Sequence, residues 1–548
     1  MTTAAAPATA NIASHVTRMA GLQPESPALI FLSGGTERRV CFRELDEDSD
    51  ACARGLHALG IRRGARVAVM VRPGLDFFAV TFGLFKLGAV PVLIDPGLGR
   101  ASLGRCMEEA APEAFIGIPL AHLARAAFGW GRRSLKTLVV AGPRLWPSWR
   151  TLEEIRSLGR AAVPIVDATR PSDVAAILFT SGSTGAPKGA VYTHGNFAAQ
   201  VEALRLQFAI LPGEVDLPTF PLFALFDPAL GMTAVIPEMD FTRPGSVAPE
   251  NILGPIERYG VTHLFGSPAL LDRVGRHLDG RGSALVSLKR VVSAGAPVPA
   301  KVLERFAGLL PAGAQVHTPY GATEALPVSS IASGELLGEA RRMTARGKGV
   351  CVGRPLPGVE ARIVRISDEA IPVWSESLLS PHGEIGEIVV RGGQVTASYH
   401  GRAEATALAK IPFPDGTPAH RMGDLGYFDD EGRLWFCGRK SQRVTAALGT
   451  LFTIPCEGVF NQHSSVRRSA LVGVGLRGAQ RPVLVVELEP EASASDVLRA
   501  ELFELGSRYP HTRCVNDILF HPSLPVDIRH NAKIAREKLA LWAAERLG

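Results

Sequence analysis

The segment from Thr180 to Gly189 has the residue types of a loop that grips phosphate. It reads Thr-Ser-Gly-Ser-Thr-Gly-Ala-Pro-Lys-Gly, so four hydroxyls, three glycines and one lysine occupy ten positions. Glycines let successive backbone N–H groups turn toward one anion, hydroxyls add donors, and lysine adds positive charge. The phosphate-binding residues predicted here are Thr180, Ser181, Gly182, Ser183, Thr184, Gly185 and Lys188.

The flanks of this loop decide which kind of phosphate loop it is. An apolar run at 174–179 precedes it, an extended run at 189–192 follows, and helical spacing begins only at Phe197. A Walker A loop would instead open directly into a helix through Gly-Lys-Ser/Thr. The pattern therefore predicts a strand–loop–strand unit and argues against P-loop kinases and motors. A Gly/Ser surface turn is the plainer alternative, but such a turn has no need of Pro-Lys-Gly beside a buried-type strand.

The decapeptide resembles the phosphate loop of the adenylate-forming superfamily, which includes acyl-CoA synthetases, peptide-synthetase adenylation domains and luciferases. Five more segments resemble the family's motifs in the family's order, and all six span about residues 40 to 540. The resemblance implies ATP and Mg²⁺ as cofactors. It also implies that Lys188 and its loop act on the departing pyrophosphate.

The segment Thr-Pro-Tyr-Gly-Ala-Thr-Glu ends at Glu324. By resemblance, Tyr320 and Gly321 contact adenine, Thr323 holds the α-phosphate, and Glu324 helps bind Mg²⁺, a metal that prefers one or two carboxylates beside phosphate oxygens. Thr323 and Glu324 are thus predicted catalytic residues. Residue types alone leave open a core tyrosine and a Thr-Glu helix cap. An upstream loop is implied to cover the other adenine face with Gly295, Ala296 and Pro297.

Four more positions are assigned by their likeness to the family's motifs. Asp424, in Arg-Met-Gly-Asp with Met422 where the family has Thr, is implied to hold the ribose hydroxyls, together with Arg439. The family's hinge residue appears here as Ser441. The frame Lys-Ile-x-Arg-x-x-Leu resembles the family's C-terminal motif, which implies that Lys533 is the catalytic lysine. A lone lysine near a C-terminus is usually a solvated surface residue.

A group of small and aromatic residues is expected to line the acyl pocket. Aromatic residues at threefold spacing are usually core, but beside an acyl site they could wall an alkyl channel. Most acyl-CoA synthetases have a His where this chain has Ala224. The predicted substrate-binding residues are Phe220, Phe223, Ala224, Phe226, Gly266 and Ser267.

Two segments resemble one group within the family: the Phe-Ala-Leu-Phe-Asp-Pro run that contains Ala224, and the Arg-His-Asn-Ala-Lys segment that ends at Lys533. The chain looks like the olefin β-lactone synthetases of bacterial long-chain hydrocarbon synthesis. That resemblance implies a 2-alkyl-3-hydroxyalkanoic acid, a small-molecule β-hydroxy acid, which is adenylated and then closed by its own 3-hydroxyl to a cis-β-lactone. It also implies other enzymes of the olefin pathway as partners: a thiolase-like enzyme, a reductase and a β-lactone decarboxylase. A long-chain fatty acyl-CoA ligase and a non-catalytic acyl-nucleotide binding subunit are the alternatives. No general base is assigned; His194 and Asp227 are the guesses, and a structural role fits each better.

The helices and strands that must position these residues alternate along the sequence. From about 40 to 350, helical patterns alternate with short Val/Ile/Leu runs, including strands at 66–71 and 90–94 around a helix at 75–88. This alternation predicts an α/β fold with parallel sheets covered by helices on both faces. We expect an ATP- and acyl-binding domain at 1–438, with a β-rich subdomain at 380–438. A small, mobile α+β lid at 439–548 is expected to carry the catalytic lysine.

Composition excludes several other classes. The chain has 548 residues with 59 basic and 53 acidic side chains, and no basic stripe suggests a nucleic-acid partner. Its seven cysteines form no Cys-x-x-Cys pair, so neither a disulfide framework nor a zinc site is predicted. The Ala-rich start lacks the basic n-region of a signal peptide, and the most apolar stretches contain charges or prolines, against a transmembrane segment. A cytoplasmic protein is expected.

Overall fold

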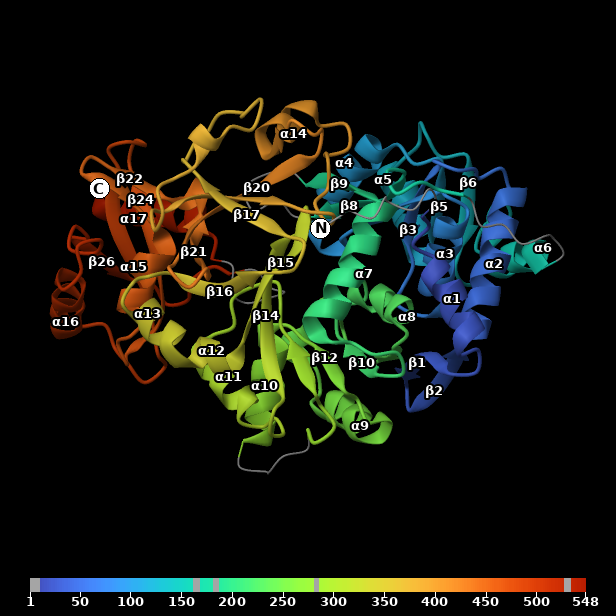
Figure 1. The fold of residues 1–548 in the computed structure, drawn as a ribbon, viewed down its shortest axis with the longest axis horizontal. Coiled ribbons are helices and arrows are strands. Elements are labelled where there is room, and N and C mark those ends of the chain that lie inside the picture. The colour runs from blue at the N-terminus through green and yellow to red at the C-terminus, as the bar shows by residue number, and fades with distance from the viewer. Residues whose placement is uncertain (1–9, 161–167, 181–186, 280–284, 527–533) are drawn as a thin grey trace.

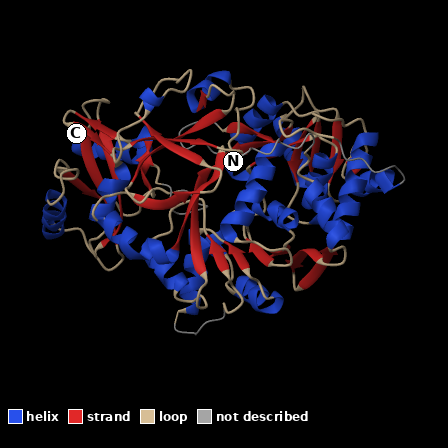
Figure 2. Cartoon of the chain, in the orientation of Figure 1, coloured by secondary structure: helices blue, strands red, loops and turns tan. Residues whose placement is uncertain are grey.

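The computed structural model describes residues 10–160, 168–180, 187–279, 285–526 and 534–548 of the chain. Helices and strands form an α/β fold, as the alternation predicts, with most strands in two large sheets (Figure 1, Figure 2).

A seven-stranded sheet carries the phosphate loop. All of its strand pairs are parallel except the last, β8–β9, and the predicted strands at 66–71 and 90–94 are confirmed as β3 and β4. In spatial order the strands are β7 (Arg150–Thr151), β6 (Thr137–Val140), β5 (Ala114–Gly117), β3 (Arg66–Met70), β4 (Val90–Ile94), β8 (Val174–Thr180) and β9 (Lys188–Thr193).

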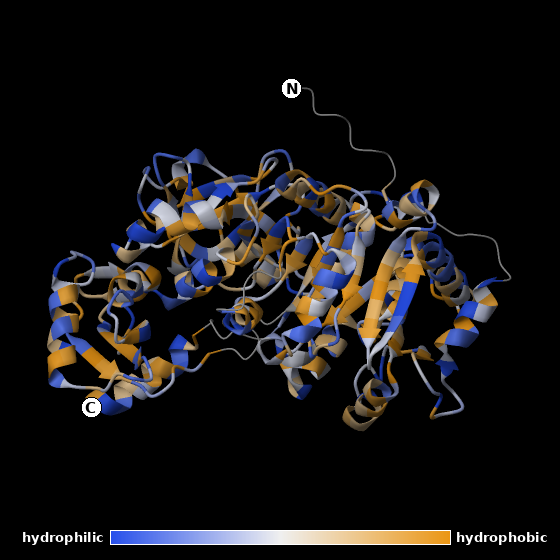
Figure 3. Cartoon of the chain, turned by 90° about the horizontal axis from the view of Figure 1, so that it is seen from below, coloured by the Kyte–Doolittle hydropathy of each residue, from blue (hydrophilic) through white to orange (hydrophobic). Residues whose placement is uncertain are grey.

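Both faces of this sheet are apolar because both are covered. Successive side chains of a strand point to opposite faces. Val92 therefore packs with residues of α4 (Arg100–Ala110) such as Met107, whereas Val67 packs with residues of α3 (Leu75–Lys86) such as Phe78. Figure 3 shows largely hydrophobic strands across the molecule, beside helices that carry both hydrophilic and hydrophobic residues.

A fourteen-stranded sheet has a parallel and an antiparallel part. The parallel part consists of β1 (Pro27–Ser33), β10 (Val215–Pro218), β11 (Thr233–Ile236), β12 (His263–Phe265), β13 (Arg290–Val292) and β14 (Gln315–Ala322), with β2 (Thr36–Cys41) antiparallel at the edge. The antiparallel part consists of β15 (Ala325–Ala332), β16 (Val350–Pro355), β17 (Glu360–Val364), β18 (Gly386–Arg391), β19 (Lys410–Pro412), β20 (Pro418–Phe428) and β21 (Leu434–Arg439). The antiparallel strands thus extend upstream of residue 380; the division into domains stays a prediction.

Helix α7 (His194–Phe208) joins the two large sheets, since it contacts both β9 and β15 (Figure 1). The remaining helices of the first 440 residues are α1 (Ser14–Leu22), α2 (Phe42–Ala58), α3 (Leu75–Lys86), α4 (Arg100–Ala110), α5 (Pro119–Phe128), α6 (Leu152–Arg160), α8 (Phe226–Leu230), α9 (Glu250–Tyr259), α10 (Pro268–Leu278), α11 (Ala300–Ala307), α12 (Ser333–Glu335), α13 (Arg341–Ala345) and α14 (Ala403–Ala409).

The C-terminal residues form a compact α+β module at one end of the molecule (orange to red in Figure 1). It contains β22 (Val444–Ala446), β23 (Gly449–Leu451), α15 (Thr453–Phe460), β24 (Val466–Val474), β25 (Arg481–Leu488), α16 (Asp496–Ser507), β26 (Asp517–Phe520) and α17 (Arg536–Leu547). Strands β24 and β25 pair antiparallel, and β26 pairs parallel to β25.

Two further expectations concern the whole chain. In the described ranges no helix is both long enough and apolar enough to cross a membrane. All seven cysteines lie in these ranges as free thiols, and five of them are buried, as expected of core thiols.

Candidate active site

The phosphate loop connects two antiparallel strands. Thr180 ends β8 opposite Lys188, which begins β9, so the predicted strand–loop–strand setting is confirmed. Ser181, Gly182, Ser183, Thr184 and Gly185 lie outside the described residues, as does the side chain of Thr180, and their role stays a prediction. The Lys188 ammonium lies 5.1 Å from the centroid of the Tyr399 ring.

Tyr320, Asp424 and Arg439 meet although they are far apart in the sequence. The Tyr320 hydroxyl donates to Asp424 Oδ2 at 2.7 Å, and Arg439 Nη1 lies 2.8 Å from Asp424 Oδ1. The pairing of β20 with β21 places Asp424 opposite Arg439. Burial, and then the Asp424 charge, raise the pKa of Tyr320, while Asp424 raises the pKa of Arg439. The buried carboxylate is therefore balanced by one cation and one donor.

Thr323 and Glu324 occupy the turn of the β14–β15 hairpin, so the helix-cap alternative is wrong. Gly321 is required here, because a Cβ at this position would lie 2.8 Å from the Ala325 carbonyl oxygen. The hairpin brings the Glu324 carboxylate to the same cluster as Lys188, since both contact Tyr399.

Three residues that the sequence analysis missed hold this turn. The Tyr399 hydroxyl donates to Glu324 Oε1 at 2.5 Å, Tyr192 donates to the Thr323 carbonyl, and the Thr396 N–H donates to the Glu324 carbonyl at 2.9 Å. No sequence signal distinguishes these residues from ordinary core and loop residues, because their role arises from contacts between distant segments.

Two buried basic residues, Lys410 and His420, also belong to this cluster and were not foreseen. They face each other across β19 and β20. Burial, then Lys410, and further Lys188 and Arg439, lower the pKa of His420.

The loop with Gly295, Ala296 and Pro297 follows the carboxyl end of β13, next to β14, which carries Tyr320. Gly295 has φ +93°, a left-handed value that favours glycine. The predicted loop is therefore at a strand end beside the tyrosine.

Only part of the predicted acyl wall is brought together. The Phe220 and Phe223 rings lie 5.2 Å apart, and Phe223 lies 4.6 Å from Phe265 at the end of β12. Phe226 instead faces Phe197 of α7, with ring centroids 6.3 Å apart. The spacing in the sequence does not show this split, because it depends on which distant residues lie near each ring, Phe265 of β12 or Phe197 of α7.

The small residues of the predicted wall, Ala224, Gly266 and Ser267, have packing or helix-capping roles in the fold. Ala224 is fully buried in the main core. The Ser267 hydroxyl accepts from the Leu270 N–H at 3.3 Å and so caps α10, and a Cβ on Gly266 would lie 3.1 Å from the Leu270 side chain. Their contact with substrate stays a prediction.

Neither guess for the general base gains support. His194 Nδ1 accepts from the Ile12 N–H at 3.2 Å, in the core at the start of α7. Asp227 is buried, and burial followed by the Asp216 charge raises its pKa well above the usual value. Both side chains are buried, which fits the structural role that the sequence favours for each.

Lys533 lies outside the described residues, and its role stays a prediction. Its flanks are described: Val526 and Ile534 form an antiparallel bridge, and Arg536 donates to Glu457 at 2.7 Å. The hinge segment is anchored as well, since Lys440, next to Ser441, lies 2.9 Å from the buried Glu387.

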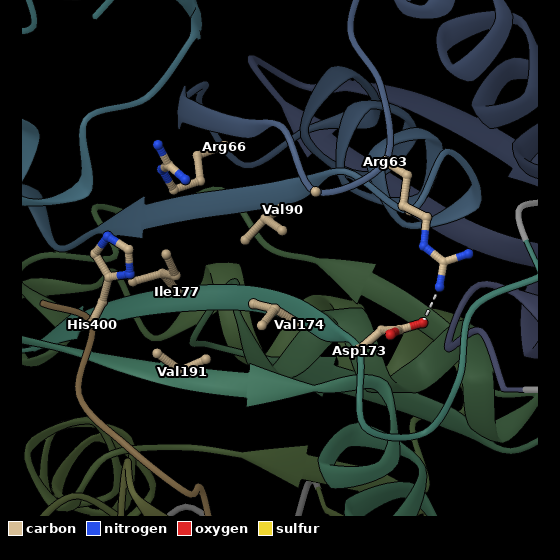
Figure 4. A pocket seen from close by; sticks show the side chains of 10 residues that line it. Arg63, Arg66, Val90, Asp173, Val174, Ile177, Val191 and His400 are labelled. Carbon is tan, nitrogen blue, oxygen red and sulfur yellow. Dashed lines mark hydrogen bonds and ion pairs between the residues drawn. The ribbon is translucent and has the colours of Figure 1, made fainter. Parts of the chain in front are cut away.

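A separate pocket of about 260 Å³ lies beside β3, β4, β8 and β9 of the seven-stranded sheet (Figure 4). Val90, Ile177 and Val191 are its apolar lining residues, and none of the predicted site residues that the structure describes lines it. Its arginines have protein partners: Arg63 pairs with Asp173, and Arg66 donates to the Ala110 carbonyl at 2.7 Å. We assign no role to it.

The family model for AMP-binding enzymes matches residues 16–400. This chain belongs to the AMP-binding enzyme family. Two of its relatives are olefin beta-lactone synthetases. The one from Xanthomonas campestris pv. campestris is 49% identical over 549 residues, covering 98% of both chains. The one from Stenotrophomonas maltophilia is 51% identical over 510 residues, covering 92% of this chain and 91% of the relative.

Two solved structures share the fold of this chain. The amide bond synthetase McbA from Marinactinospora thermotolerans has a TM-score of 0.78 at 24% identity, covering 97% of this chain and 99% of that one. O-succinylbenzoate coenzyme A synthetase (MenE) from Bacillus subtilis, in complex with AMP, has a TM-score of 0.72 at 22% identity, covering 96% and 97%. The predicted fold is confirmed over nearly the whole chain.

Proposed function

We propose that this AMP-binding enzyme uses ATP to adenylate a 2-alkyl-3-hydroxyalkanoic acid and then closes the adenylate to a cis-β-lactone, releasing AMP and pyrophosphate, in long-chain olefin biosynthesis. The observation that carries the proposal is the identity of about one half to two olefin beta-lactone synthetases over nearly the full length. The more distant long-chain-fatty-acid–CoA ligase of Thermus thermophilus is 26% identical.

The nucleotide site that we propose is centred on Tyr320, Asp424 and Arg439. Tyr320 offers a ring face for adenine, and the Asp424 oxygens can accept from both ribose hydroxyls. The phosphates extend toward Lys188 and the 180–185 loop, with Thr323 at the α-phosphate. The substrate carboxylate attacks the α-phosphorus in line, and fixed positive charge stabilises the developing negative charge.

The residues present fit Mg²⁺ held mainly by phosphate oxygens. Glu324 is a single carboxylate, and the described ranges hold no cluster of three or more metal-ligating side chains. One carboxylate plus phosphate oxygens is a common magnesium environment. The metal would neutralise phosphate charge, and Tyr399 would orient Glu324 by its 2.5 Å hydrogen bond.

Ring closure needs little more from the protein than position and dryness. The 3-hydroxyl is tethered to the acyl carbon that it attacks, so the encounter is intramolecular. Its oxygen bonds to the acyl carbon, the bond from that carbon to the AMP oxygen breaks, and the hydroxyl proton leaves to a base that we do not assign. The apolar Phe220–Phe223–Phe265 wall would exclude water, which competes for the adenylate.

We place the reaction in the cytoplasm, among enzymes that supply the β-hydroxy acid (a thiolase-like enzyme and a reductase) and one that decarboxylates the lactone. The C-terminal module from residue 439 onward is proposed as a mobile lid that carries Lys533. Lys440 is held by the buried Glu387. In this proposal the next residue, Ser441, absorbs the backbone change when the module rotates.

One assay tests the reaction. The enzyme is mixed with ATP, MgCl₂ and a 2-alkyl-3-hydroxy acid without CoA, and we expect AMP and a four-membered lactone. Product that forms only after CoA is added would support an acyl-CoA ligase instead. Nucleotide binding with no AMP under either condition would support the non-catalytic binding subunit.

The hydroxyl of Tyr399 gives a prediction about metal use. In Tyr399→Phe, Glu324 loses its hydrogen-bond donor, and we expect the Mg²⁺ concentration for half-maximal rate to rise about tenfold or more, as for other residues that orient a metal ligand. Tyr427→Phe is the control, because its hydroxyl donates to the Lys348 carbonyl. An unchanged Mg²⁺ requirement in Tyr399→Phe would show that Glu324 does not hold the metal through this contact.

A further inference from the structure

Lys410 is a buried lysine for which the protein provides no carboxylate partner within ion-pair distance among the described residues. Only 5% of the residue is exposed, and its ammonium donates to the Thr396 hydroxyl at 3.2 Å. Burial lowers the pKa of Lys410 to about 7, and only the charge of Glu324 acts in the opposite direction.

Lys86 is a second buried lysine, outside the candidate active site, and it provides a comparison for Lys410. Lys86 is fully buried, and its ammonium lies 2.6 Å from Asp46 and 2.5 Å from Asp50. Two carboxylates thus balance one ammonium. Burying a charge without such a partner costs stability, and groups of this kind gather at functional sites.

The surroundings of Lys410 identify the missing partner as an anion. The Thr396 hydroxyl, which accepts from Lys410, itself donates to the Glu324 carbonyl at 3.2 Å. His420 lies opposite Lys410, and Lys188 and Arg439 are close enough to lower the pKa of His420. Asp424 is already engaged by Arg439 and Tyr320. The cluster therefore has an excess of basic groups.

We propose that Lys410 is the buried counter-charge of the nucleotide site: the ATP phosphates, rather than a protein carboxylate, balance its ammonium. Lys410 is a positioning residue that acts on Glu324 through Thr396 and on the phosphates through its charge. The inference rests on the proposed function, because it takes ATP as the anion.

The test compares two variants. Lys410→Met removes a buried ammonium that has no acidic partner among the described residues, and Lys86→Met removes one that pairs with Asp46 and Asp50. Thermal unfolding is measured without nucleotide. We expect the melting temperature of Lys410→Met to equal or exceed that of the wild type, because an unbalanced charge is gone. Lys86→Met should melt at least about 4 °C lower, because Asp46 and Asp50 are left without their cation.

The dissociation constant for ATP with MgCl₂ is then measured by equilibrium dialysis, without the acid substrate. We expect Lys410→Met to bind about tenfold more weakly, the order of one contact to a charged group. The KM for the hydroxy acid should not change. Weaker binding with an undiminished melting temperature separates a counter-charge from a structural residue.

Two outcomes would overturn the inference: a Lys410→Met protein that loses stability or fails to fold, or one that binds ATP as tightly as the wild type. If the wild type itself does not bind ATP with MgCl₂, the proposed function fails, and that failure is visible without any variant.

Discussion

Replacing Lys533 with alanine is expected to slow adenylation about 100- to 1,000-fold, the usual effect of removing one group that stabilises developing charge at a reacting centre. Pyrophosphate release in single-turnover reactions measures it. The motif frame singles out Lys533, and the Val526–Ile534 bridge and the Arg536–Glu457 pair anchor its flanks within the C-terminal module.

Lys538→Ala is the matched control for Lys533→Ala. Lys538 lies in the same segment, five residues further on, with an exposed side chain on α17. It should retain the wild-type rate. Equal effects of the two substitutions, or a Lys533→Ala enzyme with a normal rate of pyrophosphate release, would remove Lys533 from the adenylation step.

Asp424→Ala is expected to lower kcat/KM for ATP about 100-fold or more. The change deletes the acceptor of two interactions, the Tyr320 hydrogen bond at 2.7 Å and the Arg439 ion pair at 2.8 Å. Hydrogen bonds to a charged group contribute about 1.5–3 kcal/mol each, and the abandoned donors lie in a largely buried site. The melting temperature should fall as well, because Arg439 loses its counter-charge.

Asp430→Ala provides the comparison for Asp424→Ala. Asp430 lies in the turn after β20, has a 99% exposed side chain and pairs with His382, which is itself largely exposed. Exposed pairs of this kind contribute little, so ATP use and stability should both be unchanged. A normal KM for ATP in Asp424→Ala would mean that the ribose binds elsewhere.

The first half of the site was predictable because its signals are local. The hydroxyls, glycines and lysine of the 180–189 loop lie in one decapeptide, and the apolar runs on either side place it between two strands, which the β8–β9 hairpin confirms. Short apolar runs and the helical pattern between them likewise predict β3, β4 and α3 within two residues of their observed ends.

Other features could not be predicted from the sequence, for identifiable reasons. The Thr-Glu pair was compatible with a helix cap, and only the pairing of β14 with β15 places it in a hairpin turn. The spacing of Phe220, Phe223 and Phe226 suggested one wall, yet Phe226 lies beside Phe197 of α7, a contact between distant segments that spacing does not show.

By itself, the sequence determined the chemistry to look for: a phosphate loop, an aromatic–carboxylate motif, an α/β scaffold and a resemblance specific enough to name the reaction. The tertiary structure decided how those groups are balanced. Tyr399 on Glu324, Arg439 on Asp424, and the unmatched ammonium of Lys410 join residues that are well separated along the chain. Side-chain charge and hydrogen bonding depend on distance in space, and local patterns carry no information about which distant segments will meet.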